Sequence, residues 1–252
     1  MKDRVAVVTG AGRGIGRATA RLLAERGARV LGVSRTRSEL ESLAAETGVE
    51  ILAESVATEE GCTRIVEEAH RLLGPIEILV NNAGIGSADE KPIWAQPTEL
   101  WRETMTVNLD GPFYLTRLAA RDMREAGFGR IVMVSSTSGE KGDAAESAYD
   151  ASKHGLIGLM RSAAQDVGTF GGTCNAVLPG WVRTSMAERS AATEAAARGI
   201  TTDEVWAERA KLYPAGRVLE PEEVAVVIAF LASDEAGGVN GETITVALGG
   251  GW

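Results

Sequence analysis

Short apolar runs alternate with segments of helical period along most of the chain. The runs cover residues 5–8, 28–33, 49–52, 76–80, 130–134 and 173–177, and a last one covers 242–248. The segments between them predict helices, among them two across 100–125 and one across 148–168. Strands that are apolar on both faces and separated by helices form parallel sheets covered on both sides. The sequence therefore predicts an α/β fold, a doubly wound parallel sheet flanked by helices.

A segment of about forty residues, from Trp181 to Glu220, interrupts this alternation. It is polar, rich in alanine and helical in character, and it precedes the last helix (221–232) and the last strand. No change in composition, low-complexity run or repeat marks a second domain. We therefore expect residues 1–252 to form one domain with a helical insertion at about 183–217.

The composition limits which cellular compartment and which kinds of binding partner we expect for this chain. A chain of 252 residues with 44% hydrophobic content suffices for a large core, and it shows neither a membrane-length apolar run nor a signal peptide. We expect a soluble, cytoplasmic protein. The net charge of −9, without a basic block, disfavours nucleic acid and anionic membranes as partners. Cys62 and Cys174 lack a CxxC partner, so we expect reduced thiols and no metal site.

A glycine-rich turn, TGAGRGIG, follows the first apolar run. Its glycines fit the pattern Gly10-x-x-x-Gly14-x-Gly16 and not the common G-x-G-x-x-G. In a doubly wound sheet this turn lies at the carboxyl edge, where the N-terminus of the next helix attracts anions. Glycines also let a phosphate approach the backbone closely. We expect the pyrophosphate of a dinucleotide here, and a merely tight turn is the alternative.

The tip of the second strand, Ser34-Arg35-Thr36, bears on the choice of dinucleotide. A carboxylate at this place bonds the ribose 2′-hydroxyl of NAD, whereas an arginine suits the 2′-phosphate of NADP. The tip carries Arg35 and no carboxylate, and Arg13 lies in the glycine loop. We expect NADP(H) to be preferred, with NAD(H) as the alternative. In the other interpretation, Arg35 and Arg37 are only solvated charges at a helix start.

Tyr149 and Lys153 are four residues apart, which places them on one face of the helix expected across 148–168. A cation beside a phenol lowers its pKa from about 10 toward the working range, so that the phenol can exchange a proton with a substrate oxygen. Ser136 lies thirteen residues upstream, where the run RIVMVSS ends at the carboxyl edge of the sheet. Its hydroxyl can bond a substrate carbonyl there.

With these residues the chain resembles a short-chain dehydrogenase/reductase over essentially its whole length. The resemblance implies a Rossmann-type fold in which Tyr149 exchanges the proton, Ser136 stabilises the reacting oxygen and Lys153 holds the nicotinamide ribose. It also implies that Asn108 anchors a water of the proton relay. The spacing to Tyr149 favours Ser136 over its neighbour Ser135. The motifs that carry the resemblance are Thr9-Gly10, Asn81-Asn82-Ala83-Gly84, Asn108, Ser136, Tyr149, Lys153, Pro179-Gly180 and the terminal glycines.

The resemblance further implies which residues hold the cofactor. Asn82 and Gly84 would line the adenine ribose side, and Val182 and Thr184 the nicotinamide carboxamide. Ser55 departs from the family, which usually has an adenine-contacting Asp there, and the usual Val-Asp-Gly-Gly near the C-terminus becomes Val246-Ala247-Leu248-Gly249-Gly250. The expected cofactor-binding residues are Gly10, Arg13, Gly14, Ile15, Gly16, Ser34, Arg35, Ser55, Val56, Asn82, Ala83, Gly84, Tyr149, Lys153, Pro179, Gly180, Val182 and Thr184.

The substrate is less constrained by the sequence than the cofactor. We expect Ser136, Tyr149 and Trp181 to contact it, and residues 186–213 to form the mobile substrate lid of the family, with an ordinary helical hairpin as the alternative. Parts of the chain resemble 3-oxoacyl and polyketide ketoreductases, and others 3-hydroxybutyrate dehydrogenases. The latter tend to carry a Lys for the substrate carboxylate where this chain has Glu146. A neutral or polyol ketone or an acyl thioester therefore fits better than a small free acid.

These features predict an NADP(H)-dependent oxidoreductase that moves hydride between nicotinamide and a ketone or secondary alcohol. One alternative is an NAD-dependent alcohol or polyol dehydrogenase of the same family. A catalytically silent nucleotide sensor is the alternative outside enzymes, although such a protein is expected to lose Tyr149 or Lys153. By resemblance we expect a homotetramer, or a homodimer. The helices around 101–125 and 148–168 would form one contact between subunits, and the last strand a second.

Overall fold

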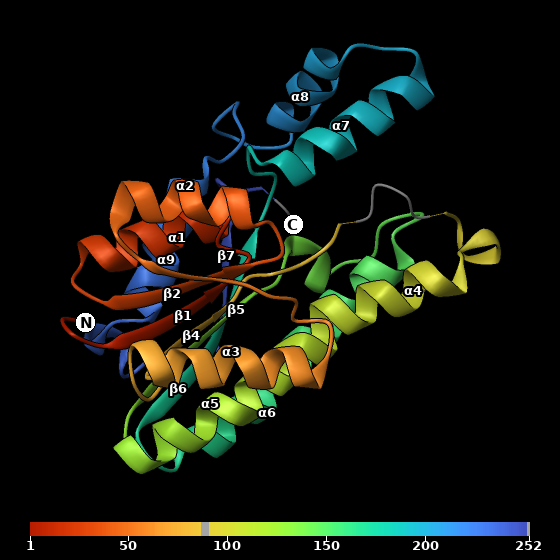
Figure 1. The fold of residues 1–252 in the computed structure, drawn as a ribbon. Helices are drawn as coiled ribbons and strands as arrows, with labels where there is room; N and C mark the ends of the chain where they lie inside the picture. Colours follow the sequence, from red (N-terminus) through yellow and green to blue (C-terminus); the bar gives the residue numbers. More distant parts are fainter. Residues whose placement is uncertain (87–90, 251–252) are drawn as a thin grey trace.

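The computed structural model describes residues 1–86 and 91–250. Seven parallel strands form one sheet in the order β3-β2-β1-β4-β5-β6-β7 (Figure 1). The doubly wound α/β fold is therefore confirmed. The strands are β1 (Val5–Thr9), β2 (Arg29–Ser34), β3 (Glu50–Ala53), β4 (Ile78–Asn81), β5 (Gly129–Val134), β6 (Gly172–Pro179) and β7 (Thr243–Val246). The α-helices are α1 (Gly14–Glu25), α2 (Arg37–Thr47), α3 (Glu59–Leu72), α4 (Thr98–Met105), α5 (Gly111–Ala126), α6 (Ser147–Gly168), α7 (Ser185–Arg198), α8 (Thr202–Lys211) and α9 (Pro221–Leu231).

Two apolar cores lie on the two faces of the sheet, because successive side chains of a strand point to opposite faces. In β1, Val7 packs with residues of α3, α5 and α6, whereas Ala6 and Val8 pack with residues of α1, α2 and α9. Figure 1 shows these two groups of helices on either side of the sheet. Both faces of the central strands are buried, which explains their continuous apolar runs.

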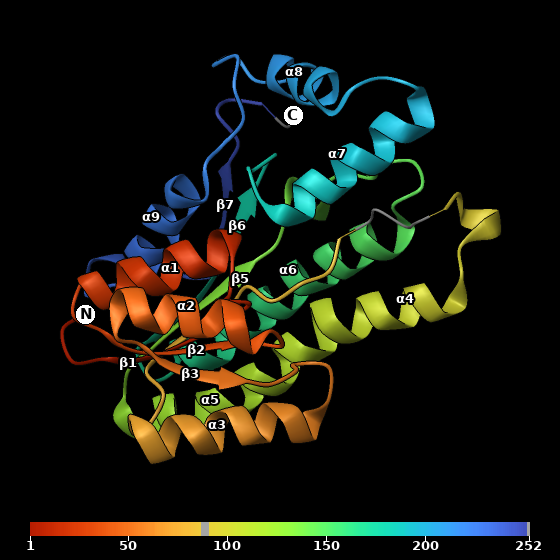
Figure 2. The ribbon, with the colours of Figure 1, turned by 45° about the horizontal axis from the view of Figure 1, so that its top comes forward.

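The predicted helical insertion forms the α7–α8 hairpin. The hairpin stands away from the two helical layers, beyond the ends of β6 and β7 (Figures 1 and 2). It has a small apolar core of its own, in which Ala191 and Ala195 of α7 meet Val205 and Trp206 of α8. Thr201 and Glu204 form a capping box that starts α8. The helical character is confirmed, and action as a mobile lid stays a prediction.

A π-helical turn, Thr106–Asp110, joins the two helices expected across 100–125. The Gly111 N–H donates to the carbonyl of Thr106, five residues back. Pro112 has no N–H to donate to the carbonyl of Asn108, so one i→i−4 hydrogen bond of a regular helix is missing at this point. Single π-turns inside helices are frequent at functional sites. This one carries the buried Asn108.

Both cysteines are buried and free. Burial raises the pKa of Cys62 to about 12, and burial likewise raises the pKa of Cys174. Both side chains are therefore protonated at neutral pH, as expected of reduced structural thiols. Within residues 1–86 and 91–250, no helix combines the length and the apolar character that crossing a bilayer requires.

Candidate active site

A cleft of about 520 Å³ opens at the carboxyl edge of the sheet. The sheet order places β1 between β2 and β4, so the chain direction along the sheet reverses at β1. Open α/β sheets bind their ligands in the crevice at such a reversal. All of the residues predicted from the sequence to bind cofactor or substrate line this cleft, except Gly16. Asn108, predicted as catalytic, does not line it either.

The glycine loop is built to receive an anion. Gly10 and Gly14 adopt φ angles of +68° and +55°, which side chains disfavour. Helix α1 starts at Gly14 without a side-chain cap on its free N–H groups and without an acidic residue in its first turn. Helix α3, by contrast, is capped by Thr58. An uncapped helix N-terminus facing a cleft fits a pyrophosphate.

Gly16 has a packing role in the structure. A side chain on Gly16 would collide with the Gly10 carbonyl oxygen and with the Asn82 amide. Asn82 in turn donates to the Thr9 carbonyl at 2.8 Å, and Thr9 Oγ1 accepts from the backbone N–H groups of Asn82 and Ala83, each at 3.0 Å. These contacts join the loops after β1 and β4. Thr9 belongs to a motif that carries the family resemblance, but this role was not predicted from the sequence.

The outer end of the cleft carries the residues predicted to select the dinucleotide. Ser34, Arg35 and Arg13 all line it, and within residues 1–86 and 91–250 Arg35 forms no ion pair. Ser55 and Val56 line the neighbouring wall, where the Ser55 hydroxyl accepts from the Ala57 N–H at 3.2 Å. Ser55 thus supplies a hydroxyl where the family usually supplies a carboxylate. One further residue of this end, Glu39, was not predicted from the sequence.

Tyr149 and Lys153 lie side by side on α6. The Lys153 ammonium is 5.6 Å from the centre of the Tyr149 ring and donates to the Val134 carbonyl at 2.9 Å. Lys153 is buried, and burial lowers its pKa to about 8. The ammonium therefore remains mostly charged at neutral pH and can favour a phenolate beside it. A side chain on Gly84 would meet Asn108 Oδ1 at 3.3 Å, and Lys153 Nζ would lie 3.6 Å away.

The pKa of Lys153 makes the stability of the protein depend on pH. Between pH 8 and its ordinary value of 10.5, the unfolded chain binds this proton and the folded chain does not, so stability rises with pH. Lys153→Met should be more stable than wild type at pH 7.5, and the difference should shrink by about 2 kcal/mol at pH 9.5. Urea unfolding at both pH values measures it. The exposed Lys141→Met serves as the control, and a constant difference for Lys153→Met would refute the prediction.

Both serines after β5 line the cleft, but they differ in burial and in the hydrogen bonds of their hydroxyls. Ser135 is buried and donates to the Lys153 carbonyl at 3.1 Å, which fixes α6 against the sheet. Ser136 is less buried, lines the cleft and accepts from the Ser138 N–H at 3.1 Å. The proton of the Ser136 hydroxyl thus remains available for a carbonyl oxygen. The arrangement favours Ser136 over Ser135 as the residue that meets substrate.

Asn108 connects the π-turn to the cleft walls. Its Oδ1 accepts from the Ile85 N–H at 2.8 Å, and its Nδ2 donates to the Ile85 carbonyl and to Ser152 Oγ, each at 3.0 Å. Ser152 donates to the Tyr149 carbonyl at 2.7 Å. Asn108 therefore ties the loop after β4 to the helix that carries Tyr149. Its part in a water relay stays a prediction.

Trp181 forms the wall between the sheet and the hairpin. Trp181 follows Pro179 and Gly180, and its backbone N–H donates to the Tyr213 hydroxyl at 2.6 Å. The buried guanidinium of Arg209 stacks on the Trp181 ring at 3.6 Å and donates to Glu194 at 3.0 Å. Such stacking holds the ring in place. Val182 and Thr184 continue the wall, and Thr184 caps α7.

Comparisons with known proteins match the chain to reductases and dehydrogenases over nearly its whole length. A family model described as enoyl-(acyl carrier protein) reductase matches residues 10–250. The 3-oxoacyl-(acyl-carrier-protein) reductase FabG of Haemophilus influenzae is 35% identical over 248 residues, which are 98% of this chain and 97% of the relative. A variant of actinorhodin polyketide ketoreductase solved with NADPH superposes with a TM-score of 0.91 at 34% identity, covering 98% and 96% of the two chains. NAD+-bound xylitol dehydrogenase also superposes with a TM-score of 0.91, at 32% identity, and the match covers 98% of this chain and 99% of the other.

Proposed function

Because the chain belongs to the short-chain dehydrogenase/reductase family, we propose that it is an NADP(H)-preferring reductase of neutral ketones, of the 3-oxoacyl type. One observation carries the proposal. Tyr149, Lys153 and Ser136 line the same cleft as the uncapped N-terminus of α1. A proton donor, a cation and a hydroxyl therefore converge where a dinucleotide fits. The Haemophilus relative, named for 3-oxoacyl reduction, supports the substrate class.

Each residue of the site has a distinct role in this reaction. A nicotinamide held in the cleft would supply the hydride for the carbonyl carbon. Tyr149 gives its phenolic proton to the carbonyl oxygen, and Ser136 donates a hydrogen bond to the same oxygen. Lys153 would hold the ribose hydroxyls, and it would stabilise the phenolate that remains, because its ammonium lies beside the ring. Asn108 keeps Tyr149 in register through Ser152.

The charge at the substrate end supports a neutral substrate. The carboxylates of Asp143, Glu146 and Asp150 lie within 4.8 Å of one another, and Asp143 and Glu146 line the cleft. Lys141 is partly neutralised by its ion pair with Asp143 at 3.2 Å. The carboxylates of Asp143 and Glu146 in the cleft lining disfavour a substrate that carries a free carboxylate beside the ketone. A thioester or ester of the same acid lacks that charge.

A substrate panel tests the function. Purified enzyme is mixed with NADPH and either acetoacetyl-CoA, ethyl acetoacetate, free acetoacetate or a cyclic diketone, and the loss of reduced nicotinamide is followed by absorbance. We expect the ester and thioester to exceed free acetoacetate in kcat/KM by at least about tenfold. Equal or better turnover of free acetoacetate would refute the neutral-substrate proposal. Oxidation of xylitol with NAD+ but no ketone reduction would favour the polyol dehydrogenase alternative.

We also propose that the protein assembles into a homotetramer. Trp101 on α4 and Phe113 on α5 expose apolar surface, as do Val226 and Phe230 on α9. These residues lie on two separate groups of helices, and two self-complementary contacts per subunit are what a tetramer of two-fold symmetry needs. Light scattering at micromolar concentration should give about four times the chain mass of 26.5 kDa. A species of one chain mass would refute assembly.

A further inference from the structure

Glu39 lies in the first turn of α2 and faces the glycine loop across the outer end of the cleft. Its Oε1 forms an ion pair with Arg13 Nη1 at 3.3 Å. Arg13 is one of the two cations that we expect to attract a 2′-phosphate. Part of its charge is therefore already compensated by a carboxylate of the chain itself.

The Glu39 carboxylate and the Ser34 hydroxyl converge above Gly12. A side chain on Gly12 would meet Glu39 Oε2 at 2.6 Å and Ser34 Oγ at 3.0 Å. Ser34 ends β2, the place where a carboxylate bonds the ribose 2′-hydroxyl in related dinucleotide sites. Glu39 comes five residues later in the sequence but reaches the same spot from α2. For this reason the sequence of the strand tip alone does not reveal a carboxylate.

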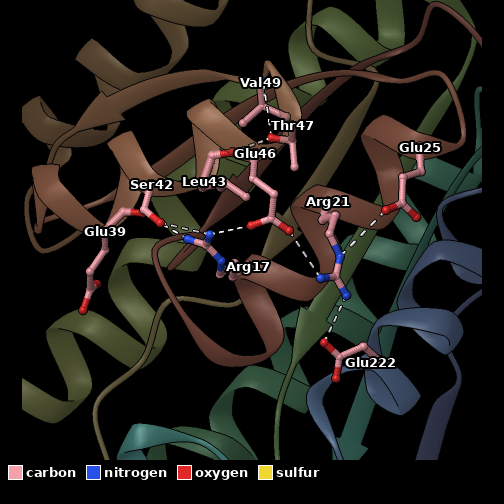
Figure 3. Close-up of polar contacts among 10 residues, drawn as sticks. All are labelled: Arg17, Arg21, Glu25, Glu39, Ser42, Leu43, Glu46, Thr47, Val49 and Glu222. Carbon is pink, nitrogen blue, oxygen red and sulfur yellow. Dashed lines mark hydrogen bonds and ion pairs between the residues drawn. The ribbon is translucent and has the colours of Figure 1, made fainter.

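The backbone of Glu39 is held in place by α1. Arg17 donates to the Glu39 carbonyl at 3.2 Å and to Ser42 Oγ at 3.2 Å, and it pairs with Glu46 at 2.6 Å. Arg21 extends this network from Glu46 to Glu222 of α9 (Figure 3). In Figure 3 the Glu39 carboxylate points away from Arg17. The network thus holds the backbone of Glu39 in position. It does not neutralise the Glu39 carboxylate.

We propose that Glu39 is a specificity-determining residue that restrains the preference for NADP(H) and lets the enzyme use NAD(H) as well. The proposal rests on the proposed function and deepens it. A carboxylate at this spot repels a 2′-phosphate and withdraws Arg13 from it, whereas it can accept a hydrogen bond from a 2′-hydroxyl. Arg35, which is unpaired among the described residues, opposes this effect and keeps the phosphate favoured.

Binding of adenosine nucleotides tests the proposal without catalysis. Isothermal titration calorimetry of the whole protein with 2′,5′-ADP and with 5′-AMP gives the affinity ratio of the two compounds. Glu39→Gln should raise the affinity for 2′,5′-ADP by about tenfold, because a charge repulsion is removed at a partly exposed site. Its affinity for 5′-AMP should stay within about twofold of wild type. The ratio should therefore rise by about tenfold.

Glu41→Gln is the matched control, since Glu41 lies on the same helix, is exposed and pairs only with Arg37 among the described residues. Its affinity ratio should equal that of wild type. An unchanged or lower ratio in Glu39→Gln would overturn the role of Glu39 and leave the proposed reductase function intact. Failure of both compounds to bind wild-type protein would overturn nucleotide binding itself, and with it both proposals.

Discussion

Replacement of Tyr149 by Phe is expected to lower kcat by about 10³-fold while the fold and the affinity for NADPH persist. The change deletes one hydroxyl at the place of proton transfer and almost no volume. General acid catalysis by one side chain contributes about 10²- to 10⁴-fold, and the Lys153 ammonium beside the ring is present to support it. The measurement is ketone reduction under saturating NADPH, with cofactor affinity followed by nicotinamide fluorescence.

Tyr114→Phe is the matched control for this prediction. Tyr114 lies on α5 and packs against the core between the sheet and helices α3, α5 and α6. It is not among the described residues that line the cleft. It loses the same hydroxyl, so turnover should remain near wild type. If Tyr149→Phe retained kcat within tenfold of wild type, the proton would come from another group. Ser136, whose hydroxyl lines the same cleft, would then be the next residue to replace.

The roles of the site residues differ in how far the sequence could predict them. The Tyr149–Lys153 spacing predicts that both side chains share a helix face, and α6 confirms it. Likewise, the apolar runs predict the strands because both faces of a parallel sheet are buried. Short-range periodicity carries this information, so one sequence suffices.

Contacts between distant segments could not be predicted in the same way. Asn108 lies in a π-turn and contacts Ile85, 23 residues away, and Ser152, 44 residues away. Gly16 fits the phosphate-loop pattern in the sequence, yet in three dimensions it admits the Gly10 carbonyl and the Asn82 amide. In the sequence, Glu39 is an ordinary acidic residue in the first turn of a predicted helix. Only the structure shows its ion pair with Arg13. Such contacts depend on the tertiary fold, which the spacing of residues along one sequence does not give.

Cofactor preference is expected to invert in the double variant Ser34→Asp with Arg35→Ala. A guanidinium bonded to a 2′-phosphate contributes roughly 1.5–3 kcal/mol, which is about one to two decades of preference for NADP(H) in wild type. The Glu39 carboxylate should hold the wild-type value near the lower limit. The variant removes the cation at the strand tip and adds a carboxylate that bonds the 2′-hydroxyl of NAD and repels the phosphate of NADP.

The measurement is kcat/KM for NADPH and NADH with one ketone, in wild type, in the double variant and in Arg35→Ala alone. Arg35→Ala should abolish most of the preference for NADP(H), because the remaining cation, Arg13, is paired with Glu39. It should not invert the preference, because Arg13 is still present. Adding Asp at position 34 should complete the inversion, since two carboxylates then face the 2′ position. Arg37→Ala is the control: Arg37 is exposed at the start of α2, pairs with Glu41 and does not line the cleft. If wild type already prefers NADH, or if the double variant leaves the ratio unchanged, Arg35 is only a solvated charge and the selection of NADP(H) by the strand tip is wrong.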